Sequence, residues 1–500
     1  MTGEPTTHSL AALARAARDL LVEAPSSDIP VSGLSFDSRA VGERHLFFCV
    51  PGTVSDGHDY ATAAVAAGAV ALVVERPTGA GVPEVLVTDA RRAMARIAAE
   101  FYDRPGDDLM LLGVTGTNGK TTTAFLLESI LTAGGLSTGL IGTIETRVAG
   151  RRKAGVRTTP ESLDLQALLA EMREAGATAV SMEVTSHALV MHRVESLRFA
   201  VAGFTNLSQD HLDFHSSMED YFAAKRMLFT HERAERGATN VDDPSGLRVF
   251  EESSIPCVGF GADERSSVRA LDVRSGPWGS EFVLDIDGVG ETKVSTALVG
   301  HFNISNCLAA ASMAWQAGID LDTIQAGIER LRAVPGRFEA VDAGQPFTVV
   351  VDYAHTPDSL DNVLRGARAL AGSGRVVCTF GCGGDRDRGK RPLMGAVAAK
   401  LADFVVVTSD NPRSEDPHAI IDSILEGVIA ERPDGPDAVL ADRKEAIGRA
   451  LAEAREGDVV VVAGKGHETG QEFRDHTIPF DDREVARDAL GELGYGGDGA

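Results

Sequence analysis

The sequence predicts an α/β protein whose parallel sheets are covered by helices, and three observations predict that class. From Leu109 onward, short β-branched runs alternate with helical stretches. A second alternation of the same kind begins near Gln345. Because parallel neighbours need a crossover connection, such alternation is typical of doubly wound sheets. The length of 500 residues requires more than one hydrophobic core.

The individual elements can be placed in chain order. Residues 9–107 mix a short helix with strands, such as those at 45–52 and 70–75. The first alternating set has strands at 109–114, 178–184 and 199–204 and helices at 122–135, 163–176 and 218–229. Residues 241–295 are rich in strand formers and glycines, which predicts a small antiparallel insert. The second set has strands at 347–354, 375–381, 403–409 and 458–464 and helices at 357–370, 390–401, 417–430 and 443–454.

Three helix starts carry a chemical mark. Thr159-Pro160, Thr356-Pro357 and Asp416-Pro417 each place a capping side chain before a proline. Proline suits the first helical position because the helix needs no amide donor there. We therefore expect helices to begin at these three prolines.

Composition excludes several classes of protein. The formal net charge is −25, which argues against nucleic acid or an anionic membrane surface as partner. No apolar run approaches the ~18 residues that span a bilayer, and the first residues lack the pattern of a signal peptide. The five cysteines are scattered, so we expect reduced thiols and a cytoplasmic protein. Cys378 and Cys382 lack a partner pair and are expected to pack in a core.

The stretch GVTGTNGKTT (113–122) joins a predicted strand to a predicted helix. Main-chain amides of a glycine-rich turn point at phosphates, and the helix N-terminus adds partial positive charge. Lys120 would reach the β- and γ-phosphates, and Thr121 would face a magnesium ion. The strict Walker spacing requires glycine at 114, where this chain has Val114, so the loop is a variant.

Three further polar residues follow predicted strands or lie in a predicted helix. Glu183 ends the strand at 178–184 and is a candidate magnesium ligand, although it could instead pair with Arg193. His211 lies in a cluster of aspartates and histidines after the next strand. Lys225 lies in a half-apolar helix, and its spacing alone favours a lysine that extends along the surface into water.

Charged motifs also follow the strands of the second alternating set. The segment GHFNISN (300–306) is predicted to be a polar loop that opens a helix, and Arg337 in GRFE could stabilise charge on a transferring phosphoryl group. Asp352 and His355 follow a strand end. Motifs after the next strands supply Arg391, Arg413, Lys465 and Glu468. Because a pocket of both signs suits a zwitterion, these residues predict an amino-acid site.

Ten motifs in this order resemble the Mur ligases over nearly the whole chain. They are GTNGKTT, MEV-S-SH-L with Thr185 in place of the usual serine, TNLS-DHLD-H, YFAAK, GHFN--N, GRFE, DYAHTPD, GCGGDRDRGKRPLMG, SDNPR and AGKGHE. The resemblance implies three domains: 1–107 for a UDP-linked substrate, 108–337 for ATP in a P-loop parallel-sheet domain, and 338–500 for an amino acid in a Rossmann-like doubly wound domain. It also implies a cytoplasmic monomer that uses ATP and Mg²⁺ in peptidoglycan precursor synthesis.

The resemblance assigns roles residue by residue. ATP would be held by Gly116, Thr117, Asn118, Gly119, Lys120, Thr121, Thr122, Asn303 and Asp352, with Lys120, Lys225, His211 and Arg337 acting in catalysis. Magnesium would be held by Thr121, Glu183, His211 and Lys225, the lysine being carbamylated by CO2. The UDP-linked muramoyl-dipeptide would meet Phe36, Ser38, Thr53, Val54, Ser55, Thr158, Thr159, Thr185 and Arg193. The amino acid would meet Arg391, Asp410, Asn411, Pro412, Arg413, Gly464 and Glu468.

The DNPR motif resembles the version of the family that selects diaminopimelate, either meso or LL. Diaminopimelate carries a second carboxylate that Arg413 can hold in a fork, whereas lysine ends in an ammonium. The expected reaction adds diaminopimelate to UDP-N-acetylmuramoyl-L-alanyl-D-glutamate through an acyl phosphate. The alternatives are another Mur-step or folylpolyglutamate-type ligase, a P-loop kinase and an NTP switch. Met191 departs from the glutamine of close relatives, so no contact is assigned to it.

Overall fold

The computed structural model describes residues 7–26, 28–52, 55–155, 157–276 and 279–496. The chain packs as two compact units. Unit 1 comprises 1–115, 136–202 and 224–236, and unit 2 comprises 116–135, 203–223 and 237–500. Within the described residues, no helix is both long and apolar enough to cross a membrane.

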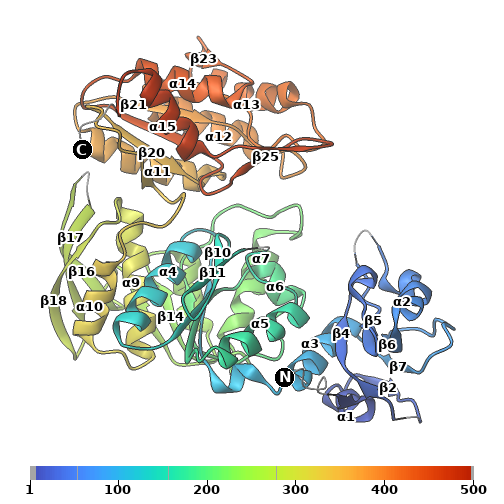
Figure 1. Cartoon of the computed structure of the whole chain (residues 1–500). Coiled ribbons are helices and arrows are strands. Elements are labelled where there is room, and N and C mark those ends of the chain that lie inside the picture. The colour runs from blue at the N-terminus through green and yellow to red at the C-terminus, as the bar shows by residue number, and fades with distance from the viewer. Residues whose placement is uncertain (1–6, 27, 53–54, 156, 277–278, 497–500) are drawn as a thin grey trace. The chain divides into compact units, whose positions relative to one another are not determined.

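The amino-terminal part of unit 1 is a five-stranded sheet with helices on it (Figure 1, blue). Its strand order is β2-β7-β6-β5-β4, and only β2 runs antiparallel to its neighbour. The strands are β2 (Leu21–Glu23), β4 (Gly33–Ser35), β5 (His45–Phe48), β6 (Ala69–Val74) and β7 (Glu84–Val87). The helices are α1 (Leu10–Ala16), α2 (Ala61–Ala67) and α3 (Ala90–Phe101), and β1 (His8–Ser9) pairs with β3 (Pro30–Val31). Alternate side chains of β5 and β6 enter two separate apolar clusters, which buries both sheet faces.

The rest of unit 1 holds strands in the order β11-β10-β9-β12-β8. Strands β8 (Met110–Thr115), β12 (Ala179–Glu183) and β9 (Thr138–Ile141) are parallel, as expected. β10 (Glu145–Val148) and β11 (Arg151–Ala154) add an antiparallel edge. Helices α5 (Ser162–Glu174) and α6 (Ser186–Val190) complete this part. β13 (Phe199–Phe204), β14 (Ala234–Asn240) and α7 (Met218–Arg226) each contain residues of both units.

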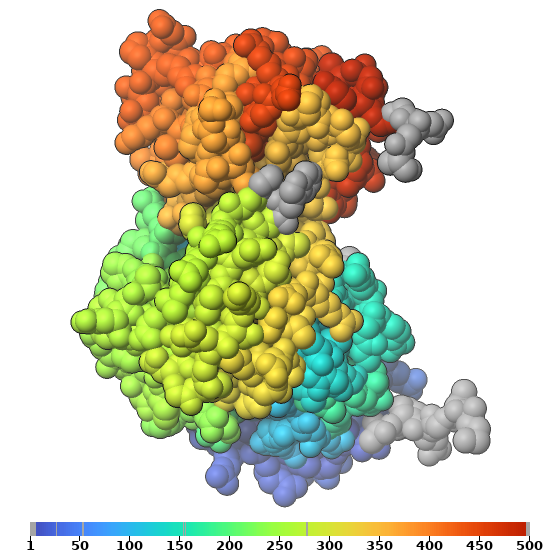
Figure 2. Space-filling view, turned by 90° about the vertical axis from the view of Figure 1, so that its left-hand side faces the viewer, coloured from blue at the N-terminus to red at the C-terminus, as the bar shows by residue number. Residues whose placement is uncertain are grey.

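In unit 2, α4 (Lys120–Ala133) packs on α9 (His301–Gln316) and α10 (Leu321–Arg330). The Ser129 hydroxyl donates to the main-chain oxygen of Gly327 at 2.7 Å. The expected insert is antiparallel in β16 (Ser266–Gly276), β17 (Gly279–Ile286) and β18 (Gly290–Thr296), which lie at the surface in yellow-green (Figure 2). Before them, α8 (Pro244–Glu252) is helical and β15 (Cys257–Phe260) is parallel to its neighbours, so the insert begins later than predicted.

The carboxyl-terminal part of unit 2 is a doubly wound sheet, as predicted (Figure 1, orange to red), and its strand order is β19-β20-β24-β21-β22-β23. Only β19 is antiparallel. The strands are β19 (Glu339–Ala340), β20 (Thr348–Asp352), β21 (Val376–Phe380), β22 (Phe404–Val407), β23 (Ala438–Val439) and β24 (Val459–Ala463). Helices α11 (Pro357–Ala371), α12 (Lys390–Leu401) and α13 (Pro417–Glu431) cover one face, and α14 (Arg443–Glu453) and α15 (Asp482–Glu492) cover the other. A hairpin of β25 (Gly470–Glu472) and β26 (Thr477–Pro479) follows β24.

Two of the three marked helix starts are confirmed and one is wrong. Thr356 caps α11 in a capping box, and Asp416 caps α13, each before a proline. The helix expected at Pro160 begins instead at Ser162, and the Thr159 hydroxyl oxygen, which would have capped it, accepts from the amide of Thr185 at 3.2 Å. Residues 301–306 of the expected polar loop form the first turns of α9. The two cysteines expected to pack in a core, 378 and 382, are buried in one.

The division into two units does not coincide with the three expected domains, 1–107, 108–337 and 338–500. Those boundaries remain a prediction.

Candidate active site

The glycines of the phosphate loop lie where a side chain would not fit. Gly116 and Gly119 have φ of 146° and 86°. A Cβ on Gly116 would lie 1.9 Å from Thr205 Oγ1, and one on Gly119 would lie 2.3 Å from Asn306 Oδ1. Val114 is fully buried inside β8, before the turn. The variant spacing is therefore compatible with the turn, because position 114 belongs to the strand.

The loop is held by the segment that follows β13. Thr117 N donates to the main-chain oxygen of Asn206 at 2.9 Å, and Asn118 N donates to Asn206 Oδ1 at 2.9 Å. Lys120 Nζ donates to the main-chain oxygens of Gly116 and Thr117 at 2.9 and 2.8 Å. No side chain caps the amino end of α4 among the described residues. This helix end therefore offers amides and a lysine to an anion.

Arg337 reaches the first turn of α4 within unit 2. Its Nη2 donates to Thr121 Oγ1 at 3.1 Å, and its guanidinium carbon lies 4.5 Å from the ring centroid of Tyr353. Its Nε is buried without a hydrogen-bond partner among the described residues. Stacking on Tyr353 orients a cation beside the phosphate loop.

Asp352 fixes the segment that carries Arg337. Its carboxylate oxygens accept from the amides of Phe338 and Ala354 at 2.6 and 2.7 Å. Burial raises the pKa of Asp352 to about 6, against the opposing effect of Arg337. The structure thus gives Asp352 a positioning role in addition to the ATP contact implied by resemblance.

Asn303, another residue expected at ATP, is 1% exposed and donates to the main-chain oxygen of Val299 at 2.8 Å. It also accepts from Asn306 Nδ2 at 3.0 Å. Asn306 is the residue packed over Gly119, and it was not among the expected site residues. Its place one helical turn after Asn303 could have indicated it once residues 301–306 were recognised as helix.

In unit 1, Glu183 is 1% exposed and is surrounded by threonines. Its two carboxylate oxygens accept from the amide and the hydroxyl of Thr143 at 2.8 and 3.1 Å. The Thr143 hydroxyl lies 3.0 Å from that of Thr158, and the Thr159 hydroxyl lies 3.4 Å from that of Thr185. These hard oxygen donors at a strand end fit the ligand chemistry of Mg²⁺.

The alternative pairing of Glu183 with Arg193 is wrong. Arg193 Nη2 forms an ion pair with Glu161 Oε1 at 2.7 Å. Arg91 and Arg157, which were not expected at the site, bind the same carboxylate at 3.2 and 2.6 Å. Three arginines therefore share one acid, and the cluster has an excess of positive charge that suits an anionic substrate.

The expected nucleotide-sugar residues lie in the amino-terminal part of unit 1. Phe36 packs against the apolar core of its sheet, and Ser38 begins a short 3₁₀ helix, Ser38–Ala40. Ser55 is exposed. Thr53 and Val54 lie outside the described residues.

The other two expected metal ligands differ in exposure. Lys225 is 1% exposed, so the expectation of a surface lysine from helix spacing is wrong. The His211 side chain is 42% exposed, with Nε2 3.4 Å from Asp210 Oδ2. Among the described residues, no three His, Cys, Asp or Glu side chains are grouped as around a metal ion. Because Glu183 and Lys225 belong to unit 1 and His211 to unit 2, the ligand set remains a prediction.

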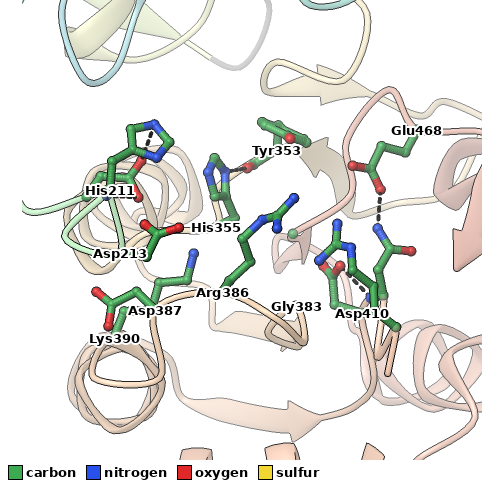
Figure 3. A pocket seen from close by; sticks show the side chains of 14 residues that line it. His211, Asp213, Tyr353, His355, Gly383, Arg386, Asp387, Lys390, Asp410 and Glu468 are labelled. Atoms are coloured by element: carbon green, nitrogen blue, oxygen red, sulfur yellow. Dashed lines mark hydrogen bonds and ion pairs between the residues drawn. The ribbon is translucent and has the colours of Figure 1, made fainter. Parts of the chain in front are cut away.

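A cavity of about 230 Å³ lies in unit 2 (Figure 3). It is formed by loops that follow β13, β20, β21, β22 and β24. Its lining residues are Asp210, His211, Asp213, Tyr353, His355, Gly383, Arg386, Asp387, Lys390, Asp410, Asn411, Arg413, Gly464 and Glu468. The carboxyl ends of parallel strands are the usual place for ligands in doubly wound sheets.

One wall of the cavity is a buried polar network. Lys465 is fully buried, and its Nζ donates to Asn411 Oδ1 and Glu468 Oε2, both at 2.8 Å. Asn411 Nδ2 also donates to Glu468 at 2.7 Å. Gly464 has φ of 117°, and a Cβ there would lie 2.5 Å from Asp410 Oδ2. The lysine thus fixes two expected substrate contacts without itself lining the cavity.

Two residues expected at the amino acid do not line the cavity, and others take their place. Arg391 is buried, and its Nη2 and Nη1 donate to Glu415 Oε1 and Oε2 at 2.8 and 3.1 Å. Pro412 also lies outside the lining. Figure 3 instead shows Arg386 extending into the space between His355 and Glu468. The motif DRDRGKR (385–391) contains four basic side chains. Which of them faces the cavity depends on the path of the loop that leads into α12.

His355 and Lys390 were likewise missed as lining residues. Lys390 is 6% exposed and stands at the first position of α12. Burial lowers the pKa of His355 to about 4, with a further contribution from Lys390. His355 is therefore neutral near pH 7, and its Nδ1 lies 2.8 Å from the main-chain oxygen of Tyr353.

Comparison with known proteins matches nearly the whole chain. Residues 30–102, 114–314 and 336–466 match family profiles described as "Mur ligase family, catalytic domain", "Mur ligase middle domain" and "Mur ligase, glutamate ligase domain". Proteins named UDP-N-acetylmuramoyl-L-alanyl-D-glutamate–2,6-diaminopimelate ligase from Geobacillus kaustophilus and Streptomyces avermitilis are 49% and 47% identical. The alignments cover 93% and 97% of this chain and 96% and 97% of those proteins.

Solved structures agree with this match. A structure bearing the same ligase name has a TM-score of 0.69 and 31% identity, covering 98% of this chain and all of that one. The MurF ligase from Thermotoga maritima in complex with ADP has a TM-score of 0.63 and 18% identity, covering 92% and 96%. At that identity, the second likeness concerns the fold alone.

Proposed function

The chain belongs to the Mur ligase family, and we propose that it joins diaminopimelate to UDP-N-acetylmuramoyl-L-alanyl-D-glutamate with ATP. The observation that carries this proposal is the mixed-charge cavity of unit 2, in the same unit as the phosphate loop. The names of the relatives at 47% to 49% identity support it.

The charges of the cavity fit diaminopimelate in particular. Its lining carries three permanent cations, Arg386, Lys390 and Arg413, and five carboxylates, among them Asp410 and Glu468. Diaminopimelate has two ammonium and two carboxylate groups, so it needs partners of both signs. A nucleotide phosphate would need mainly cations and amides, which the loop at 116–122 offers instead.

In the proposed reaction, ATP phosphorylates the terminal carboxylate of the muramoyl-dipeptide. Lys120 and Arg337 offset the charge on the transferring phosphoryl group. The free amine of diaminopimelate then attacks the acyl phosphate, forms the amide and releases phosphate. In this proposal Asp410 and Glu468, which line the cavity, bind an ammonium group and orient the amine, and Arg413 binds the far carboxylate.

Magnesium, when bound, would neutralise phosphate charge, and Thr121, Glu183 and His211 are the residues that would hold it. We further propose that Lys225 is carbamylated. Full burial of a lysine ammonium is costly, whereas a carbamate would be an anion able to bind a cation. In this proposal the enzyme is a cytoplasmic monomer whose cysteines stay reduced.

The test is phosphate release measured with each substrate omitted in turn. We expect release to require ATP, the muramoyl-dipeptide and diaminopimelate together. Release without any amino acid would favour a P-loop kinase or an NTP switch. Release with a different acceptor or amino acid, such as a folate and glutamate, would favour another ligase of the superfamily. Assaying the meso and LL isomers side by side identifies the substrate isomer.

A further inference from the structure

We propose that Glu472 is a positioning residue that aims Arg413 at the second carboxylate of diaminopimelate. The hairpin of β25 and β26 would then determine specificity as well as complete the fold. This inference rests on the amino-acid role proposed for the cavity.

The main chain of Arg413 is held by the hairpin. Arg413 has φ of 50°, a left-handed conformation that is unfavourable for a residue with a side chain. Its amide donates to the main-chain oxygen of Glu472 at 3.0 Å, and it forms an isolated parallel bridge with Phe473. The hairpin therefore supports the backbone conformation from which the arginine side chain projects.

The side chain of Arg413 is held from two directions. Its Nε donates to Glu472 Oε2 at 2.9 Å, and its Nη1 donates to the main-chain oxygen of Gly384 at 2.8 Å. A guanidinium has five N–H groups, so these two contacts leave three for a ligand. With its Nε edge bound to Glu472, Arg413 can offer its terminal nitrogens to a carboxylate.

The hairpin is itself anchored to the cavity wall. Gln471 Nε2 donates to the main-chain oxygen of Asp410 at 2.7 Å. The amide of Glu472 donates to Asn411 Oδ1 at 3.0 Å, and Lys465 Nζ donates to the main-chain oxygen of Gly470 at 2.7 Å. The main chain of Glu472 is therefore held in a fixed position relative to the residues that would bind the rest of the amino acid.

The Glu472 side chain is 52% exposed, and a half-exposed ion pair contributes little to folding stability. Its removal should therefore leave the fold intact while freeing the guanidinium to adopt other rotamers. Binding would then have to restrict that motion again, at a cost in affinity. L-Lysine has no second carboxylate, so its use should not depend on the orientation of Arg413.

The experiment compares Glu472→Ala, Glu472→Gln and Asp475→Ala in the full-length enzyme. Asp475 lies at the tip of the same hairpin, is 84% exposed and pairs with His476, so its removal makes the same charge change without touching Arg413. Steady-state kinetics with diaminopimelate, with L-lysine and with varied ATP give the constants, and thermal unfolding checks the fold.

We expect Glu472→Ala to raise KM for diaminopimelate about 10-fold, with KM for ATP and kcat/KM for L-lysine within about twofold of wild type. Glu472→Gln keeps a hydrogen-bond acceptor, so it should raise KM for diaminopimelate only about threefold, and Asp475→Ala should have the kinetic constants of wild type. Unchanged diaminopimelate kinetics, equal losses for both amino acids, or the same effect from Asp475→Ala would overturn the inference. A wild-type enzyme that needs no diaminopimelate would overturn the proposed function instead.

Discussion

Removing one charge from the ion pair of Arg443 and Asp482 should strongly destabilise the carboxyl-terminal sheet. Both side chains are 0% exposed, and Arg443 Nε and Nη2 lie 2.7 and 2.6 Å from the two carboxylate oxygens. Arg443 also donates to the main-chain oxygens of Ser409 and Ala463, at 3.2 and 2.9 Å. Those residues precede Asp410 and Gly464, which line the cavity, so the pair joins the segments that follow β22 and β24.

The perturbation is Asp482→Asn, which keeps the shape but leaves the arginine charge buried without its counter-ion. Breaking a buried pair in this way costs about 3–5 kcal/mol of unfolding free energy. For a cooperative unit of roughly 150–250 residues, that loss lowers Tm by about 6–20 °C. Asp361→Asn breaks an ion pair with Arg365 on the exposed face of α11 and should leave Tm unchanged.

Urea unfolding followed by circular dichroism, together with calorimetry, measures both quantities. The double variant Arg443→Met with Asp482→Leu should recover much of the loss, because an apolar pair of similar volume no longer buries a charge. A loss below about 1 kcal/mol for Asp482→Asn would refute the reasoning, because it would mean that water reaches the arginine. A double variant as unstable as the sum of both single variants would show that the two side chains are not coupled.

Three other variants test the site. Lys225→Ala should abolish ligation and be partly rescued by a small carboxylate such as acetate; undiminished ligation would remove the carbamate from the proposal. Arg413→Ala should raise KM for diaminopimelate about 10- to 100-fold and leave KM for ATP within about twofold, whereas equal losses would give Arg413 a structural role. Burial raises the pKa of Asp352 to about 6, so its protonated form favours the folded state below pH 4 and that contribution is lost as pH rises through 6. The unfolding free energy of wild type, measured with urea, should therefore fall by about 2 kcal/mol between pH 4 and 7 relative to Asp352→Asn, and parallel pH profiles would contradict this.

The order of strands and helices could be predicted because most segments show the apolar spacing of a strand or a helix within their own sequence. The valine runs of β20 and β24 and the apolar spacing of α11 need no distant contact to be recognised. The prediction of where α5 starts was wrong because of a tertiary contact. Thr159 has the features of a cap, but its hydroxyl oxygen accepts from the amide of Thr185, 26 residues away. A local signal cannot reveal a distant donor that competes for the same hydroxyl oxygen.

The site was predictable to the level of motifs but not always to the residue. The segment 385–391 contains four basic side chains, and resemblance selected Arg391 from them. In the structure Glu415 binds that arginine away from the cavity, while Arg386 extends into it. Glu415, whose ion pair decides which arginine faces the cavity, lies in another loop. Residue spacing within 385–391 therefore could not indicate it. The burial of Lys225 was not evident from the helix pattern either, because spacing within a helix does not show what packs against it.

The net negative charge of the chain has less effect on a ligand than the charges that line the cavity. A net charge of −25 opposes every anionic ligand at long range, yet charge beyond about 10 Å is largely screened at physiological ionic strength. What would act on the amino acid, in the function proposed, is the local arrangement, in which five carboxylates and three cations line one small space. Such a lining penalises a simple anion or a simple cation, because either one meets charges of its own sign. A ligand with two ammonium and two carboxylate groups avoids that penalty, and the distance between its charged ends then distinguishes it from shorter amino acids.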